Sequence, residues 1–180
     1  MKKLALVFAL ALVSATSFAQ KTVMVGGAAM YPTKNIIENA VNSKDHTTLV
    51  AAVKAAGLVE TLSSAGPFTV FAPTNEAFNK LPAGTVETLV KPENKGTLTS
   101  ILTYHVVAGK MSAADIIAKI KAGHGKATMK TVQGETLTAS LKGKHVILTD
   151  EKGGKAKVTI ANVNQSNGVI HVIDTVLMPK

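Results

Sequence analysis

The chain contains no cysteine and no tryptophan, and its aromatic residues are limited to two tyrosines and five phenylalanines. Without cysteine, a disulfide framework, a thiolate zinc site, an iron–sulfur cluster and a cysteine nucleophile are all excluded. With so few aromatic rings, a stacking platform for sugars or single-stranded nucleic acid is hard to assemble. The stability of the fold must therefore come from packing and hydrogen bonds.

Arginine is also absent from the chain. All 20 basic residues are lysine, and together with 11 carboxylates they give a net charge of +9. Proteins that grip phosphates or base edges normally use the planar guanidinium of arginine, so we expect no nucleic-acid partner despite the positive charge. The 180 residues, 46% of them apolar, are enough for one domain with its own core.

The first 19 residues have the three-part pattern of a secretory signal peptide. Lys2 and Lys3 supply positive charge, Leu4–Val13 is an unbroken apolar run, and Ser17 and Ala19 are the small residues that precede a cut after Ala19. The run is too short to span a bilayer, so we expect no membrane insertion. We predict a secreted or periplasmic chain that begins at Gln20 and has a net charge of +7. The compact leader is typical of a bacterial protein.

The rest of the chain has the organisation of a single domain. Residues 20–32, which contain Gly26, Gly27 and Pro32, predict a flexible lead-in. The domain is expected over residues 33–178, since neither a repeat nor a linker divides it. Helical periodicity dominates its first part and strand periodicity its second. Because strands from both parts must share a sheet, we predict an α+β domain with a β-sandwich or half-barrel core and several packed helices.

Apolar spacing, caps and turn residues place the expected elements along the chain. Asp45 is expected to begin a helix that ends at Gly57, and Ser112 with Asp115 is expected to form a capping box. Helices are predicted around Ile36–Val41, Leu49–Ala56, Val86–Val90, Leu98–Leu102 and Ile116–Ile120. Strands are predicted at Phe68–Ala72, Tyr104–Val107, Thr128–Val132, Thr136–Leu141, Val146–Thr149, Lys157–Val163 and Val169–Met178.

The last predicted strand carries two specific expectations. It is apolar on both faces, which is typical of a central strand. It follows Asn167-Gly168, and because both residues tolerate positive φ, this pair predicts a hairpin with a type I′ turn.

Residues Gly66–Phe78 predict a corner between a strand and a helix. The strand Phe68–Ala72 is enclosed by two prolines, and Thr74-Asn75 then offers side-chain oxygens to the free amides of a new helix. Phe78 is expected to fold back towards Phe68 and Phe71 as an aromatic plug.

This corner resembles the first signature segment of the fasciclin (FAS1) domain family. Thr103–Val107 is similar to the family's Tyr-His segment, and Asn167–Asp174 is similar to its second signature segment. The three segments occur in the family's order, and the resemblance extends from Thr33 to Met178. It implies a wedge-shaped β-sandwich with several helices and a role in adhesion or surface interaction outside the cytoplasm. One departure is Asn75, where the family commonly has an acidic residue.

The resemblance also suggests which residues hold the fold and which bind. Tyr104-His105 and Asp115-Ile116 resemble elements implicated in integrin contacts in animal members, so these four are candidate binding residues. Each also has a packing explanation, since Asp115 completes a cap and Ile116 fills an apolar helix face. We expect His105 to hydrogen-bond the Thr74-Asn75 corner. The residues with an expected structural role are Phe68, Phe71, Thr74, Asn75, Phe78, Asn167, Gly168, His171 and Asp174.

No motif in the sequence predicts an enzyme. A Gly-x-Ser-x-Gly elbow and a His-Glu-x-x-His metal motif are both missing, and the five histidines are scattered singly. We therefore expect no catalytic residue, no metal and no cofactor. Lysines gather at residues 119–130 and 142–157, where they serve solvation or attract an anionic surface.

The function predicted from the sequence is cell adhesion or surface interaction by non-catalytic binding. The expected partner is an extracellular or cell-surface protein or an anionic polysaccharide. The alternative is a soluble carrier or sensor that holds a small apolar ligand between its helices and its sheet.

Overall fold

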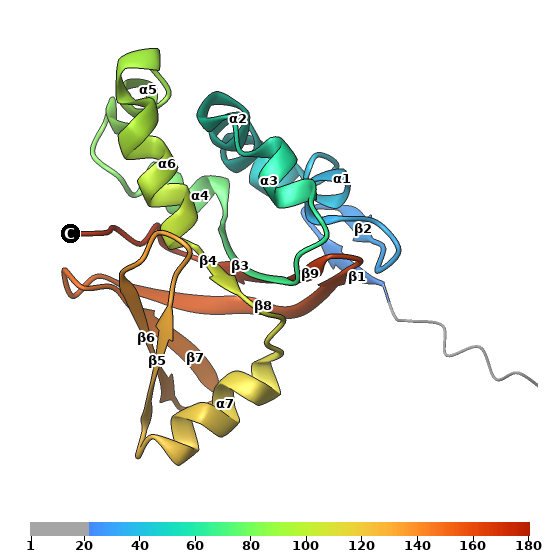
Figure 1. Cartoon of the computed structure of the whole chain (residues 1–180), viewed down its shortest axis with the longest axis vertical. Coiled ribbons are helices and arrows are strands. Elements are labelled where there is room, and N and C mark those ends of the chain that lie inside the picture. Colours follow the sequence, from blue (N-terminus) through green and yellow to red (C-terminus); the bar gives the residue numbers. More distant parts are fainter. Residues whose placement is uncertain (1–21) are drawn as a thin grey trace, which may run out of the picture.

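The computed structural model of the chain describes residues 22–180, so the predicted signal peptide at residues 1–19 lies outside the described residues. Figure 1 shows two lobes joined by long strands. We call residues 22–105 the helical lobe and residues 113–165 the strand lobe. Within the described range, no helix combines the length and the hydropathy that crossing a membrane requires.

The structure mixes short helices with a small hairpin and one large sheet. The helices are α1 (Ile36–Ala40), η1 (Lys44–His46), α2 (Thr47–Ala56), α3 (Val59–Ser63), α4 (Asn75–Asn79), α5 (Thr85–Leu89), η2 (Pro92–Asn94), α6 (Lys95–Tyr104) and α7 (Ala113–Ala122). The strands are β1 (Val23–Val25), β2 (Ala28–Met30), β3 (Phe68–Pro73), β4 (Val106–Ala108), β5 (Lys126–Lys130), β6 (Thr136–Lys142), β7 (His145–Thr149), β8 (Lys155–Gln165) and β9 (Gly168–Ile173).

The large sheet has seven strands in the order β4-β3-β9-β8-β7-β6-β5. β3 runs parallel to β9, and the other neighbouring pairs are antiparallel. A bridge between Val107 and Thr131 brings the β4 edge to the β5 end of the sheet, so the sheet is nearly closed. This is the α+β half-barrel architecture expected from the sequence.

The long strand β8 connects the two lobes (Figure 1). Its pairing with β9 shifts register between Val158 and Ile160 and again between Ile160 and Val163. Asn162, within the second shift, has a φ of 60°. Such bulges bend a strand and increase its twist, so one strand pairs with β7 in the strand lobe and with β9 beneath the helices.

The hydrophobic core consists of three clusters. The first lies between α1, α2, α3, α6 and one face of β3 and β9. The second lies between α7, the inward face of β5–β8 and the other face of β3. The third is small and joins α4 to α6. Because β3 and β9 separate two clusters, both of their faces are buried. All six residues of β9 are buried, which confirms the prediction of a central strand.

The predicted aromatic plug at the corner is wrong. Phe68 packs against the first cluster, Phe71 lies in the second and Phe78 in the third. Phe68 and Phe71 are three positions apart on one strand, so they point to opposite faces of the sheet. The three rings therefore fill three separate parts of the core.

The Asn167-Gly168 hairpin is present, but its turn is not of type I′. Ser166 and Asn167 form the connection, Gly168 is already the first residue of β9, and neither Asn167 nor Gly168 has positive φ. Glycine is required at position 168 for another reason. A Cβ there would collide with the carbonyl oxygen of Phe68 on the adjacent β3.

Residues 23–30 form a hairpin where the sequence indicated a flexible lead-in over residues 20–32. Gly26 and Gly27 have φ of 57° and 76°, and they make the tight turn between β1 and β2. Val25 and Met30 are buried in the first cluster. The two glycines are thus a hairpin signal, because positive φ at both central residues suits the twist of the flanking strands.

Candidate functional site

The strand-to-helix corner works as predicted at Thr74 and differently at Asn75. The Thr74 hydroxyl accepts a hydrogen bond from the Ala77 amide at 3.3 Å, which caps α4. The Asn75 side chain instead reaches the start of α2, where its Oδ1 accepts from the Thr48 amide at 3.0 Å and its Nδ2 donates to the Lys44 carbonyl at 2.8 Å. No side-chain bond from its own N-cap residue caps α2, so Asn75 satisfies one of the free helix donors.

The side-chain amide of Asn75 makes a hydrogen bond that a carboxylate could not make. An aspartate would keep the acceptor for Thr48 but would lose the donor that binds the Lys44 carbonyl. Asparagine at this position therefore joins the corner to α2 through both its oxygen and its nitrogen, and it carries no charge.

His105 connects α6 to the end of the described chain, not to the Thr74-Asn75 corner as predicted. Its Nδ1 donates to the Ile101 carbonyl at 2.8 Å, and its Nε2 accepts from the Leu177 amide at 3.0 Å. Burial lowers the pKa of His105 to about 4, so the ring is neutral at neutral pH. The prediction was wrong about the partner because it could not include the fold of residues 174–180.

His171 has the same kind of environment on β9. Its Nε2 donates to the Met111 carbonyl at 2.9 Å, its Nδ1 accepts from the Asn162 amide at 3.3 Å, and its ring stacks on Phe71 with 5.7 Å between centroids. Burial lowers its pKa. Both nitrogens of His105 and of His171 are occupied by backbone groups, so neither ring offers a free nitrogen to a metal or a substrate.

Asn167 and Asp174 hold the two ends of β9. The Asn167 Oδ1 accepts from the Ile36 amide at 3.0 Å, and its Nδ2 donates to the Leu62 and Ser64 carbonyls at 2.8 Å each. One buried side chain thus joins the start of α1 to the end of α3. At the other end, the Asp174 Oδ1 accepts from the Lys157 amide at 2.8 Å and extends the pairing of β8.

Three of the four candidate binding residues lie inside the protein. Tyr104 and Ile116 have no exposed surface, and His105 is 3% exposed. Contact with a partner through these side chains would require the core to open. Asp115 is exposed, and its carboxylate accepts from the Ser112 amide at 2.8 Å, which completes the predicted capping box. Those hydrogen bonds with Ser112 lower the pKa of Asp115.

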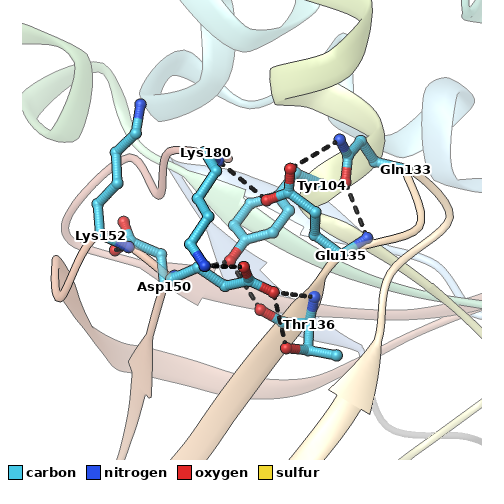
Figure 2. Close-up of polar contacts among 8 residues, drawn as sticks. Tyr104, Gln133, Glu135, Thr136, Asp150, Lys152 and Lys180 are labelled. Atoms are coloured by element: carbon cyan, nitrogen blue, oxygen red, sulfur yellow. Dashed lines mark hydrogen bonds and ion pairs between the residues drawn. The ribbon is translucent and has the colours of Figure 1, made fainter.

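Figure 2 shows the Tyr104 ring among polar side chains of the strand lobe. Its hydroxyl donates to the Thr136 carbonyl at 2.8 Å and accepts from the Glu151 amide at 3.3 Å. Burial, together with neighbouring carboxylates, raises the pKa of Tyr104 to about 12. The phenol therefore stays protonated and joins α6 to β6.

The carboxylates near Tyr104 are also bonded within the fold (Figure 2). The Glu151 carboxylate accepts from the amide and the hydroxyl of Thr136 and forms an ion pair with Lys180 at 3.1 Å. The Glu135 carboxylate accepts from the Lys180 amide at 2.9 Å. The buried Asp150 accepts only from backbone amides, those of residues 152, 154 and 178. This group positions the last residues of the chain against the sheet.

Sequence reasoning assigned no role to Asn39, Ser43 or His46, all of which are buried. Asn39 donates to Gln165 on β8 and to the Tyr31 carbonyl. Asn39 could have been recognised as a polar residue within the apolar spacing of a short predicted helix. His46 is a single histidine before a helix, and no sequence pattern marks it.

His46 lines a small cavity of about 50 Å³ between α1, α2 and the sheet. The lining is almost entirely apolar and includes Val53, Val70 and Ile170. His46 Nδ1 shares a hydrogen bond with the Ser43 hydroxyl at 2.9 Å, whereas its Nε2 makes none within the described part of the chain. Burial lowers the pKa of His46. Both side chains are less than 5% exposed, so this pair is not open to a substrate from solvent.

The polar residues of the signature-like segments have structural roles. Residues 22–180 contain no group of three His, Cys, Asp or Glu side chains placed to hold a metal ion. The polar side chains at Asn75, His105, Asn167 and His171 bind backbone groups of other segments, and that of Thr74 caps its own helix. The three segments singled out in the sequence therefore form connections between parts of the fold.

Comparison with known proteins identifies the family and the fold. A model of the fasciclin domain family matches residues 44–179. Protein sll1483 of Synechocystis sp. is 51% identical over 160 residues, which are 89% of this chain and 82% of that protein. The cell surface glycolipoprotein MPB83 of Mycobacterium bovis is 41% identical over 122 residues, covering 68% of this chain and 48% of its own.

A solved structure of a FAS1 domain pair from the insect cell adhesion molecule fasciclin I superposes with a TM-score of 0.70. The match covers 81% of this chain and 51% of that one, at 18% sequence identity. At this identity the likeness concerns the fold alone.

Proposed function

The chain belongs to the fasciclin domain family, and from that premise we propose that it is an exported protein that acts by non-catalytic binding, in adhesion or in contact with a cell surface. Two of the similar proteins support this proposal by their names, one as a cell surface glycolipoprotein and one as an insect cell adhesion molecule. The three-part pattern of residues 1–19 supports export.

One structural observation carries the non-catalytic part of the proposal. The histidines and amides of the segments that resemble the family signatures are buried and bonded to backbone groups, as His105, Asn167 and His171 show. Side chains used in this way stabilise a rigid shape. Contact with other molecules is then left to the exterior of the domain.

Export is tested with the full chain expressed in a bacterial host. We expect the protein in the extracytoplasmic fraction, with an N-terminus at Gln20 by mass spectrometry. Cytosolic protein that retains residues 1–19 would contradict export.

Binding is tested with beads that carry the exported protein. We expect these beads to retain cells or envelope fragments of the source organism better than beads that carry an unrelated exported protein of equal net charge. Because bridging two surfaces needs two contacts, light scattering on the exported protein should accompany the test. Equal retention on both kinds of bead would overturn the adhesion proposal.

The alternative function, a carrier of a small apolar ligand, is favoured by the cavity beneath α1 and α2. The volume of this cavity, about 50 Å³, argues against a carrier, because a cavity that accepts benzene measures about 150 Å³. A larger ligand would require α2 to move away from the sheet. Solvent extraction of the purified protein followed by mass spectrometry tests this function, and a stoichiometric apolar molecule would favour the carrier over adhesion.

A further inference from the structure

The outer face of the strand lobe is a polar surface. In β5, β7, the first part of β8 and β6 up to Ser140, buried and accessible residues alternate along each strand, and the inward-facing Leu141 at the end of β6 is exposed. The buried set packs with Ile116 and Ile120 of α7 in the second cluster. The helix packs on β5 and β6, and the second cluster as a whole covers the inward face of the four strands, whereas the side chains of the other face are exposed or half-buried.

The register of the four strands brings the accessible residues into rows. Lys126, Ser140, Ile147 and Lys157 lie opposite one another across the strands, and Thr128, Thr138, Thr149 and Lys155 form the next row. Lys130 pairs with Thr136, and Lys142 with His145. We call this surface the Lys/Thr face. Its residues are Lys126, Thr128, Lys130, Thr136, Thr138, Ser140, Lys142, His145, Ile147, Thr149, Lys155 and Lys157.

The face has a net positive charge. Among residues 22–180 the ion pair identified is Lys180 with Glu151, so none of the five lysines on the face is paired. Two carboxylates at its border bind other groups and form no ion pair with these lysines. Glu151 binds Thr136 and Lys180, and Asp174 accepts a hydrogen bond from the Lys157 amide. The helical lobe, by contrast, has six lysines and six carboxylates.

Protection of sheet edges does not account for all of these lysines. Lys126 and Lys130 lie on the edge strand β5, where a charged side chain discourages pairing with another sheet. Lys157 lies inside the sheet, because its backbone is paired with Ile147 on one side and bonded to Asp174 on the other. A charge at that position therefore has a role in what the face contacts.

The residue types of the face distinguish between possible partners. Protein interfaces are depleted in lysine and enriched in aromatic residues, and this face has no aromatic residue except His145. Membrane insertion uses exposed apolar side chains, whereas Ile147 is the one apolar residue here and is half-buried. Rows of hydroxyls and lysines suit a polymer with hydroxyl and anionic groups. The four strands span about 14 Å at their usual spacing, which gives such a chain several points of contact.

We propose that the Lys/Thr face is the docking surface for an acidic polysaccharide, one whose sugar units carry carboxylate or sulfate groups. The proposal rests on the proposed binding function and names the surface and the partner class. The lysines attract the anionic groups, and the threonine and serine hydroxyls form hydrogen bonds with the sugar hydroxyls.

The test measures binding of the exported protein to polygalacturonate and dextran sulfate, with neutral dextran and phosphatidylglycerol vesicles as comparison. We expect binding to both acidic polymers, none to dextran, and a steep loss of affinity as salt is raised, because exposed charges are screened. Absence of binding to both acidic polymers at low salt would overturn the proposal. Binding to the vesicles alone would assign the face to a membrane and would overturn it as well.

Two matched variants locate the site. The variant K126Q/K130Q/K155Q/K157Q should bind the acidic polymers at least about tenfold more weakly than the wild type. The variant K34Q/K54Q/K91Q/K95Q removes the same charge from the helical lobe and should stay within about twofold. All eight substitutions are at accessible lysines, and a thermal melt checks that each variant is folded. Equal affinity of the two variants would contradict the assignment of this face.

The hydroxyl rows are tested separately with T138V/T149V. We expect a weaker loss of affinity that does not depend on salt, since hydrogen bonds and not charges are removed. The polysaccharide proposal can fail while the adhesion proposal holds, and the bead assay separates the two outcomes. If beads that carry the K126Q/K130Q/K155Q/K157Q variant retain cells as well as wild-type beads do, the domain adheres through another face. If wild-type beads retain cells no better than beads with the unrelated protein, adhesion itself is contradicted.

Discussion

The helical lobe and the strand lobe differ in where they place their polar side chains. The helical lobe has equal numbers of lysines and carboxylates, and it buries Asn39, Ser43 and His46. The strand lobe has nine lysines and four carboxylates, and the inward face of its strands is apolar. The helical lobe uses its buried polar groups to join its segments, whereas the strand lobe presents its lysines to solvent and keeps a smaller set, such as Asp150 and Glu151, for bonds within the fold.

The difference follows from how the backbone donors and acceptors of each lobe find hydrogen-bond partners. Strands β5–β8 bond to one another, so few backbone groups are left over. The helical lobe contains several helices of five residues, and each short helix has free donors and acceptors at its ends. Side chains such as Asn75 and Asn167 supply those missing partners. Buried polar residues of the helical lobe are therefore needed for stability, and the lysines and threonines on the outer face of the strand lobe are available for contact.

The largest predicted effect concerns pH and His105. The folded protein protonates this ring near pH 4, while an unfolded histidine titrates near 6.5. Between these values the unfolded chain binds more protons, so the free energy of unfolding falls as pH is lowered from 6.5 to 4, by roughly 3 kcal/mol from this residue. The lowered pKa values of His46 and His171 act in the same direction. Urea denaturation across this pH range measures the slope.

The His105→Gln variant is the control for this slope. It should be about 2 kcal/mol less stable at neutral pH, because the Leu177 amide or the Ile101 carbonyl loses its partner. Its pH dependence should be shallower than that of the wild type, with the remainder due to the other buried histidines. A slope as steep as that of the wild type would show that His105 is not the group that titrates.

A second prediction concerns Asn167, which connects β9 to the helical lobe. The Asn167→Ala variant leaves the Ile36 amide and two carbonyls without partners, so the free energy of unfolding should fall by about 2 kcal/mol. Asn164→Ala on the same hairpin is the matched control, since its one side-chain hydrogen bond is long, at 3.4 Å. The control should stay within about 0.5 kcal/mol of the wild type. Equal losses in the two variants would contradict the role of the buried amide.

Most of the architecture was predictable from the sequence because local patterns determine it. Strand periodicity and the turn residues between the runs identified the strands of the strand lobe, and Ser112-x-x-Asp115 identified the start of α7. Apolar residues on both faces identified β9 as a central strand. These signals depend on neighbours in sequence, so no knowledge of the fold was required.

The partners of the buried polar residues were not predictable in the same way. Asn75 bonds to residues 44 and 48, His105 to residue 177, and Asn167 to residues 36, 62 and 64. Each bond joins segments that are far apart in sequence, so the partner is fixed only when the whole chain is folded. The Lys/Thr face could not be predicted for the same reason. Its lysines form two groups in sequence, and the strand register brings them onto one surface.

The smallest predicted effect concerns Ser112, at the boundary of the strand lobe. Ser112→Ala removes the hydroxyl that caps α7, and an N-cap of this kind contributes about 1 kcal/mol. The same substitution should raise the pKa of Asp115 towards its ordinary value, because hydrogen bonds with Ser112 are the main cause of its lowering. NMR titration of the Asp115 carboxyl measures this shift. An unchanged pKa would mean that the cap does not hold the carboxylate, and Asp115 would then be free to contact a partner.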